Sequence, residues 1–159
     1  MTDEQIIQLI TARFPADIRE TSVYRGDLTV VVEAARIAEV AGYVKTELGF
    51  DLIIDCCGVD LYRPGDRFEV VYNIYSLAHK RYLRLKVRIG EDHPVVPSVT
   101  GVWPGANWHE RETFDMFGIK FAGHPDLRRL YMPEEFEYHP LRKDFPLMGI
   151  PDSLPLPRR

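Results

Sequence analysis

The last 41 residues of the chain, 119–159, restrict its fold most, because they carry seven of its 12 prolines and no regular helical or strand period. They are nevertheless too apolar for a disordered tail. The large apolar side chains are Phe121, Leu127, Leu130, Tyr131, Met132, Phe136, Tyr138, Leu141, Phe145, Leu147, Met148 and Ile150. Ordering this segment would cost about 1–2 kcal/mol per residue. At about 25 cal/mol per Å², that cost requires more than roughly a thousand Å² of apolar contact.

We therefore predict two units, an α+β domain over residues 1–118 and an extended C-terminal arm over residues 119–159 that docks on a partner subunit. A small sheet that is already covered by its own helices has little apolar surface left for such an arm. The alternative is an arm that folds back over the edge of its own sheet.

Residues 82–89 carry the clearest secondary-structure signal, because four aliphatic side chains alternate there with three basic ones. This period of two predicts a strand with one core face and one charged face. Together with the helical patterns around it, the strand indicates helices packed on a small mixed β-sheet.

Shorter signals predict the other elements of the domain. They are a helix from the capping box Thr2-x-x-Gln5 to Pro15, a hairpin of 18–24 and 28–32, a helix from 37 to Gly49, a strand over 52–59, a hairpin of 68–75 and 82–89, a helical turn at 98–103 and a helix from Pro104 to Gly118. The continuous apolar run of 52–59 predicts a central strand buried on both faces.

Composition and charge exclude several classes of function. The net charge of −4 provides no basic field for nucleic acid, and no apolar run approaches the roughly 18 residues of a membrane span. The acidic N-terminus does not resemble a secretion signal, so we expect a soluble, cytosolic chain.

Cys56 and Cys57 are adjacent and point to opposite faces of a strand, so this chain alone cannot hold an iron–sulfur cluster. We predict no metal and no cofactor in it, and we favour inert packing roles for both cysteines.

Residues 108–118 combine acidic and aromatic side chains on one predicted helix. A catalytic or metal site would need His109, Glu112 and Asp115 to converge, but three ligands on one helix span too wide an arc. We favour a structural hypothesis, in which acidic residues of this helix pair with arginines of the arm or of a partner. The available groups are Arg128, Arg129, Arg142 and Lys143, with Asp144 closing the network and Arg111 able to pair with Asp115 four residues on.

Phosphate-binding and nucleophile motifs are absent from the sequence, since its glycines form no G-x-G-x-x-G and no nucleophile elbow occurs. His124 and His139 each precede a proline, which is typical of turn residues rather than of ligands. A flavin or nicotinamide site is therefore not expected in this chain.

Three spaced motifs resemble those of one protein family. Residues 110–119 read E-R-E-T-F-D-M-F-G-I, residues 123–130 read G-H-P-D-L-R-R-L, and residues 139–146 read H-P-L-R-K-D-F-P. Their order and spacing resemble the 30-kilodalton family of respiratory complex I, which comprises the C subunits of the NADH–quinone oxidoreductase. The likeness extends over nearly the whole chain and is weakest over residues 1–25.

The resemblance implies a cofactor-free structural and assembly subunit in the peripheral arm of complex I, with FMN and iron–sulfur clusters in partner subunits. It implies that the C-terminal arm lies along the D subunit of the quinone-reducing module, and that the complex sits at the cytoplasmic face of the bacterial plasma membrane. The positions implied as intersubunit or arm-anchoring residues are Glu110, Arg111, Glu112, Asp115, His124, Arg128, Arg129, His139, Arg142, Lys143 and Asp144.

Two alternatives remain open. Related subunits occur in membrane-bound hydrogenases and in quinone reductases that use other electron donors, and nothing in this sequence identifies the donor. The second alternative is a free-standing enzyme that uses His109, Glu112 and Asp115, which would require an enclosed pocket around those three groups.

Overall fold

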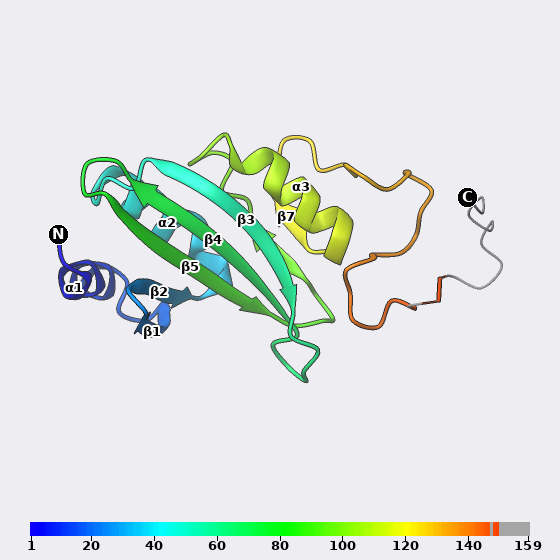
Figure 1. The fold of residues 1–159 in the computed structure, drawn as a ribbon, viewed down its shortest axis with the longest axis horizontal. Coiled ribbons are helices and arrows are strands. Elements are labelled where there is room, and N and C mark those ends of the chain that lie inside the picture. The colour runs from blue at the N-terminus through cyan, green and yellow to red at the C-terminus, as the bar shows by residue number, and fades with distance from the viewer. Residues whose placement is uncertain (147, 150–159) are drawn as a thin grey trace.

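The computed structural model describes residues 1–146, 148 and 149, and this part of the chain has an α+β fold, as predicted (Figure 1). The helices are α1 (Asp3–Arg13), η1 (Ala34–Arg36, a 3-10 turn), α2 (Ile37–Thr46) and α3 (Ala106–Phe117). The strands are β1 (Ile18–Tyr24), β2 (Asp27–Val32), β3 (Leu52–Asp60), β4 (Phe68–Ser76), β5 (Arg81–Ile89), β6 (Val95–Pro97) and β7 (Lys120–Ala122). None of these helices is long and apolar enough to cross a membrane.

The larger sheet has five strands in the order β1-β2-β5-β4-β3. The β2–β5 pair is parallel and the other neighbours are antiparallel, so the sheet is mixed, as predicted. Both hairpins, β1–β2 and β4–β5, form where they were expected. Helix α2 lies between β2 and β3 in the sequence and therefore carries the chain from one side of the sheet to its far edge.

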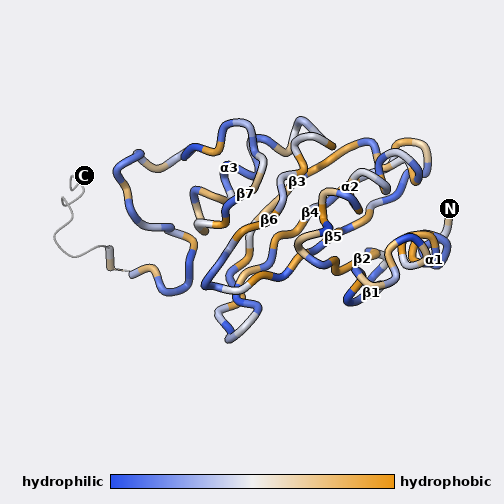
Figure 2. Tube along the Cα trace, turned by 180° about the vertical axis from the view of Figure 1, so that it is seen from behind, coloured by the Kyte–Doolittle hydropathy of each residue, from blue (hydrophilic) through white to orange (hydrophobic). Residues whose placement is uncertain are grey.

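One hydrophobic core holds the domain together, and β5 shows how the sequence builds it. Its four aliphatic side chains are buried, with Leu85 at 0% exposure. On the other face, Arg84 pairs with Asp27 and Lys86 with Glu69. The alternation over residues 82–89 thus correctly predicted both the buried face and the charged face of β5. Figure 2 shows hydrophobic residues along the strands and helices, whereas the arm is largely hydrophilic with separate hydrophobic residues.

The prediction of a central strand over residues 52–59 was wrong, because β3 is an edge strand. Leu52 and Ile54 are 41% and 46% exposed, and the register shifts between Ile53 and Asp55, a type of irregularity that is common at sheet edges. An apolar run in the sequence indicates that a strand is buried. It does not show whether neighbouring strands or a packed helix bury it. Here α3 packs on β3 at Gly58, where an added Cβ would lie 2.7 Å from the Phe117 ring.

A small parallel pair, β6–β7, was missed by sequence reasoning because each strand has only three residues. This pair joins the start of the arm to the domain, and Ile119 and Phe121 are buried in the common core. The irregular chain therefore begins after Ala122. The division at residue 118 stays a prediction.

Candidate functional site

The arm is attached to the domain at the C-terminal end of α3. The last four carbonyls of an α-helix have no partner within the helix, and here the arm supplies most of the donors. Phe114 O accepts from the C-cap residue, Gly118 N (2.8 Å). The arm donates to the next three carbonyls: His139 Nδ1 to Asp115 O (2.9 Å), Leu141 N to Met116 O (3.1 Å) and Arg142 Nε to Phe117 O (2.6 Å). The positive charge of Arg142 also lies where the helix dipole is negative. The H-P-L-R motif is thus a helix cap that comes from a distant part of the chain.

Gly118 makes this close approach possible. Its φ of 75° is left-handed, a conformation that glycine adopts without the steric cost of a Cβ. An added Cβ would lie 2.5 Å from both His139 Nε2 and Arg142 Nη2. The predicted end of the helix at Gly118 is confirmed, and the glycine also leaves room for the arm.

Asp115 anchors the next part of the arm from within α3. Its side chain is fully buried, and Oδ2 accepts hydrogen bonds from the backbone N–H groups of Leu130, Tyr131 and Met132 at 2.7–3.0 Å. Its Oδ1 pairs with Arg129 at 2.8 Å. Burial alone would raise the pKa of Asp115, but these four donors outweigh it and hold the pKa below its ordinary value. The structure thus contains the expected pairing of a helix carboxylate with an arm arginine.

Arg111 holds the arm in a different way from the expected one. Instead of pairing with Asp115, it donates to the carbonyls of Arg128 and Arg129 at 3.1 and 3.2 Å, and its guanidinium lies 4.9 Å from the centre of the Trp108 ring. The reason is that Asp115 is already occupied by Arg129 and the three backbone donors.

A second anchor lies at the C-terminal end of β3, and sequence reasoning missed its two central residues. Arg67 is buried and pairs with Asp60 at 3.0 Å and with Asp144 at 2.8 Å. Lys143 contributes only its backbone N–H, which donates to Asp60 Oδ2 at 2.9 Å. Hydrogen bonding to Asp60 raises the pKa of Arg67, so this pair stays ionised. The sequence did contain a signal for this pair, because an acidic and a basic residue stand at the two ends of the loop between β3 and β4.

Of the other basic arm residues that were predicted, Arg128, Arg142 and Lys143 do not pair with acidic residues of α3, contrary to the expectation. Arg128 forms an exposed pair with Asp126 at 2.9 Å. Arg142 donates to a carbonyl and lies 5.1 Å from the centre of the Phe68 ring. His124 is a turn residue, since its Nδ1 accepts from Asp126 N and its Nε2 contacts the carbonyl of Asn107.

Glu110 and Glu112 occupy opposite environments on α3. Glu110 is fully buried inside its own domain, where it accepts from Ser98 Oγ at 2.6 Å and from Val99 N at 2.7 Å. Burial raises the pKa of Glu110 to about 7. Glu112 is exposed. Glu110 therefore anchors a turn of the domain, whereas Glu112 faces outward.

The alternative catalytic arrangement is not assembled. The Asp115 carboxylate faces the arm, while His109 and Glu112 line a groove beside Cys57. Among the described residues, no group of three or more histidine, cysteine or acidic side chains is placed to hold a metal ion.

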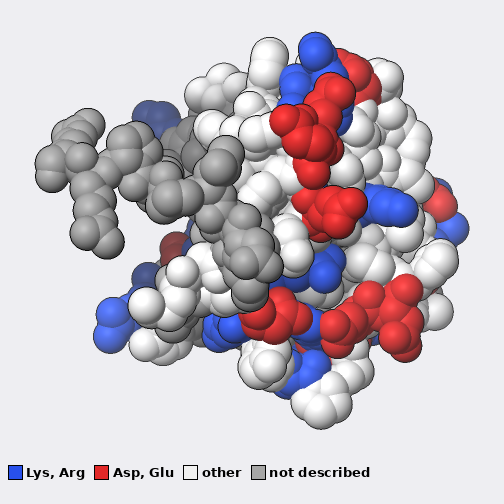
Figure 3. Space-filling view, turned by 90° about the vertical axis from the view of Figure 1, so that its right-hand side faces the viewer, with Lys and Arg blue, Asp and Glu red and all other residues white. Residues whose placement is uncertain are grey.

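Several large apolar side chains of the arm are left uncovered, although Leu127 and Met132 pack partly against the core of the domain. From Ala122 to Gly149, none of the described residues is buried, and Tyr131, Leu141 and Tyr138 are 62%, 55% and 44% exposed. Figure 3 views this end of the molecule and shows acidic and basic side chains on its surface beside neutral ones. Fixed backbone and exposed apolar side chains are together typical of a preformed docking surface.

Comparison with known proteins gives consistent matches. Residues 30–151 match the family described as "Respiratory-chain NADH dehydrogenase, 30 Kd subunit". The chain is 49% identical to the C subunit of the NADH-quinone oxidoreductase of Roseiflexus sp. (strain RS-1), over 89% of this chain and 83% of that one. It is 48% identical to the C 2 subunit of the NADH-quinone oxidoreductase of Rhizobium meliloti (strain 1021), over 97% and 86% of the two chains.

Two solved structures share the fold. A trypsin-resistant fragment (1–134) of Nqo5 is 34% identical, with a TM-score of 0.68 over 78% of this chain and 98% of the fragment. A chain of the membrane-bound sulfane sulfur reductase, an archaeal respiratory membrane complex, is 27% identical, with a TM-score of 0.78 over 91% of this chain and 86% of that chain.

Proposed function

This chain belongs to the family of the 30 kDa subunit of respiratory-chain NADH dehydrogenase, and we propose that it is a docking subunit that performs no chemical step itself. Membership makes it one of the subunits of an NADH–quinone oxidoreductase. In our proposal, FMN and iron–sulfur clusters in partner subunits carry electrons from NADH to quinone. This chain, without a cofactor of its own, keeps the quinone-reducing module in position while the complex pumps protons.

The observation that carries this proposal is the contrast within the arm between its backbone and its side chains. The backbone is fixed by Asp115, Arg111 and Asp60, yet large apolar side chains such as Tyr131 and Leu141 remain exposed. A surface that is ordered before binding loses less conformational entropy when a partner covers it. We therefore assign Arg111 and Asp115 of α3, and the arm residues Arg129, His139 and Arg142, to the anchoring of this surface.

The partner that we propose is the D subunit of the quinone-reducing module, with the arm lying along it. The chain would then reach the membrane only through the complex, as a peripheral subunit at the cytoplasmic face. The exposed aromatic residues support this role, since aromatic side chains are enriched in protein interfaces.

The experiment compares assembly with turnover in cells that carry variants of the chain. Arg142→Ala removes a donor to the end of α3, and truncation at Gly123 removes the whole irregular arm. We expect both to lower the amount of assembled complex in detergent-solubilised membranes while each assembled complex keeps its NADH–quinone activity. Arg25→Ala, at the exposed tip of the β1–β2 hairpin, is the control and should change neither quantity. Normal assembly with lost turnover would contradict a purely docking role.

A second candidate keeps the role and changes the complex. The likeness to the sulfane sulfur reductase chain fits this alternative, an equivalent subunit in a related membrane complex with another electron donor, but the NADH–quinone oxidoreductase relatives support the first candidate better. The proteins that co-purify with the tagged chain distinguish the two candidates. NADH-binding flavoprotein subunits support the first, and a nickel-site or sulfur-reducing subunit supports the second.

A further inference from the structure

A groove of about 420 Å³ lies between β3, α3 and the arm. It forms beside Gly58, which lets the Phe117 ring pack directly on the β3 backbone. Met116, Phe117 and the arm residue Leu141 provide the apolar part of its wall. Because Leu141 is 55% exposed, this wall continues into the exposed surface of the arm.

The polar part of the wall is acidic and contains Asp55, Glu112 and the exposed thiol of Cys57. Both carboxylates line the same groove as the thiol. Partial burial raises the pKa of Cys57, and the charges of Asp55 and Glu112 raise it further. His109 completes this part of the wall.

These carboxylates lack the cationic partners that Asp60, Asp115 and Asp144 have. Within the described residues, Glu112 forms no ion pair or side-chain hydrogen bond, and Asp55 only accepts from the Asn73 amide at 2.8 Å. Asp60, Asp115 and Asp144, by contrast, each pair with an arginine. The charges of Arg84 and Lys86 also reach Cys57, but these two residues pair with Asp27 and Glu69.

We propose that this groove receives an arginine side chain of the partner subunit. Its aliphatic stem would lie on Met116 and Phe117, and its guanidinium would bind between Asp55 and Glu112. Arginine fits because it combines an apolar stem with a planar, permanently charged head that pairs with carboxylates. The inference rests on the proposed docking function and adds the chemistry of one contact, which would fix the register of the partner along the arm.

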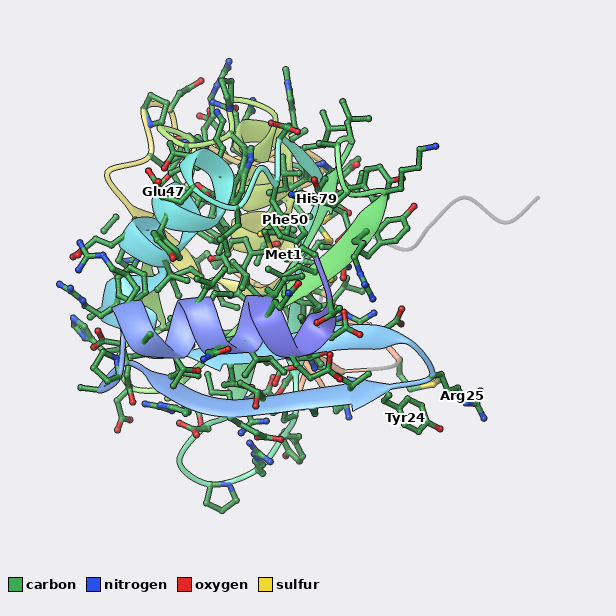
Figure 4. The ribbon with its side chains drawn as sticks, turned by 90° about the vertical axis from the view of Figure 1, so that its left-hand side faces the viewer. Met1, Tyr24, Arg25, Glu47, Phe50 and His79 are labelled. Atoms are coloured by element: carbon green, nitrogen blue, oxygen red, sulfur yellow. The ribbon has the colours of Figure 1, made fainter. Side chains whose placement is uncertain are left out.

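The first test is charge reversal in the assembled complex. We expect Glu112→Lys to lower the fraction of the chain that co-purifies with the other subunits by about tenfold or more, because two like charges would then meet. Glu112→Gln should cause a smaller loss and a weaker dependence of assembly on salt. Glu47→Lys, at the exposed end of α2 (Figure 4), makes the same charge change away from the groove and should leave assembly unchanged.

Three outcomes separate the hypotheses. If the unmodified chain co-purifies with oxidoreductase subunits and Glu112→Lys co-purifies equally well, the groove proposal is overturned and the proposed function stands. If the unmodified chain co-purifies with none of them, both are overturned. A loss with Glu112→Lys and none with Glu47→Lys supports both.

The second test uses Cys57 as a reporter, because its thiol lies in the groove while Cys56 is buried. We expect alkylation of Cys57 by N-ethylmaleimide to be at least about tenfold slower in the complex than in the isolated full-length chain, since the partner would cover it. Equal rates would overturn the proposal. So would faster alkylation of the isolated chain after removal of residues 150–159, which would identify those residues as the occupant. Alkylation that slows as the concentration of the isolated chain rises would indicate a second copy instead, and would also overturn it.

Discussion

The sheet domain and the arm of this molecule are held by different forces. In the domain, side chains such as Leu85 and Tyr72 are fully buried, and burial of apolar surface is the main favourable contribution. In the arm, no described residue after Phe121 is buried. The chain is held there mainly by hydrogen bonds to Asp115 and to the end of α3, with partial packing of Leu127 and Met132 on the core. A protein can thus fix the path of a segment largely with polar contacts and keep several of its apolar side chains free for a partner.

The largest difference between the two regions should appear when the same side chain is shortened in each. Leu85→Ala leaves a cavity in the core and should lower the free energy of unfolding by about 2–5 kcal/mol. Leu141→Ala removes an exposed side chain and should lower it by less than about 0.5 kcal/mol in the isolated chain. Urea unfolding of both variants measures the two losses in the free energy of unfolding. Equal losses would show that the arm belongs to the core.

A second effect separates two carboxylates on the same helix by their response to pH. Glu110 has a pKa of about 7 in the folded chain, above its value in the unfolded chain. Its contribution to stability is therefore complete below the unfolded pKa and is lost as the pH rises through about 7. The loss between pH 4.5 and pH 8 is about 3 kcal/mol. Urea unfolding across this range should show the decline in the unmodified chain. Glu110→Gln should flatten the profile, and an unchanged slope in that variant would assign the decline to another group.

Asp115 should show the opposite dependence, and it should affect the arm rather than the domain. Its pKa is lowered in the folded chain, so its contribution is present above the unfolded pKa and is lost as the pH falls below about 4. Asp115→Asn should weaken the attachment of residues 130–132 by about 1–3 kcal/mol. Hydrogen exchange of those amides should speed up, while the β4 and β5 amides stay protected. Faster exchange throughout the sheet would mean that arm and domain open as one unit.

The smallest effect is expected for an exposed ion pair of the arm. Arg128 and Asp126 are both more than half exposed in their side chains, and such pairs contribute about 0–1 kcal/mol. Arg128→Ala should therefore leave both unfolding and the exchange of residues 130–132 nearly unchanged. A large effect would show that Arg128 anchors the arm through its side chain as well as its carbonyl.

Sequence reasoning succeeded where the signal is local. The alternation around Leu85, the capping box at Thr2 and the helix end at Gly118 each depend on neighbouring residues, and all three are confirmed. It failed where the partner is distant in the sequence. The edge position of β3 and the pairing of Arg67 with Asp144 depend on elements that no local pattern encodes.

The candidate site was predicted in its composition but only partly in its contacts. The basic arm residues and the acidic helix residues were recognised as a set, but only Arg129 pairs with a carboxylate of α3. Arg111, Arg142 and His139 bind backbone carbonyls instead. Side-chain patterns do not reveal these contacts, because every residue carries a carbonyl and only the fold decides which ones lack a partner.

Hydroxyl-radical footprinting of Tyr131, Tyr138 and Leu141, in the isolated chain and in the assembled complex, tests the central claim most directly. The three side chains should be reactive in the isolated chain, where they are 44–62% exposed, and protected in the complex, where a partner would cover them. Protection already present in the isolated chain, or full reactivity that persists in the complex, would contradict the account.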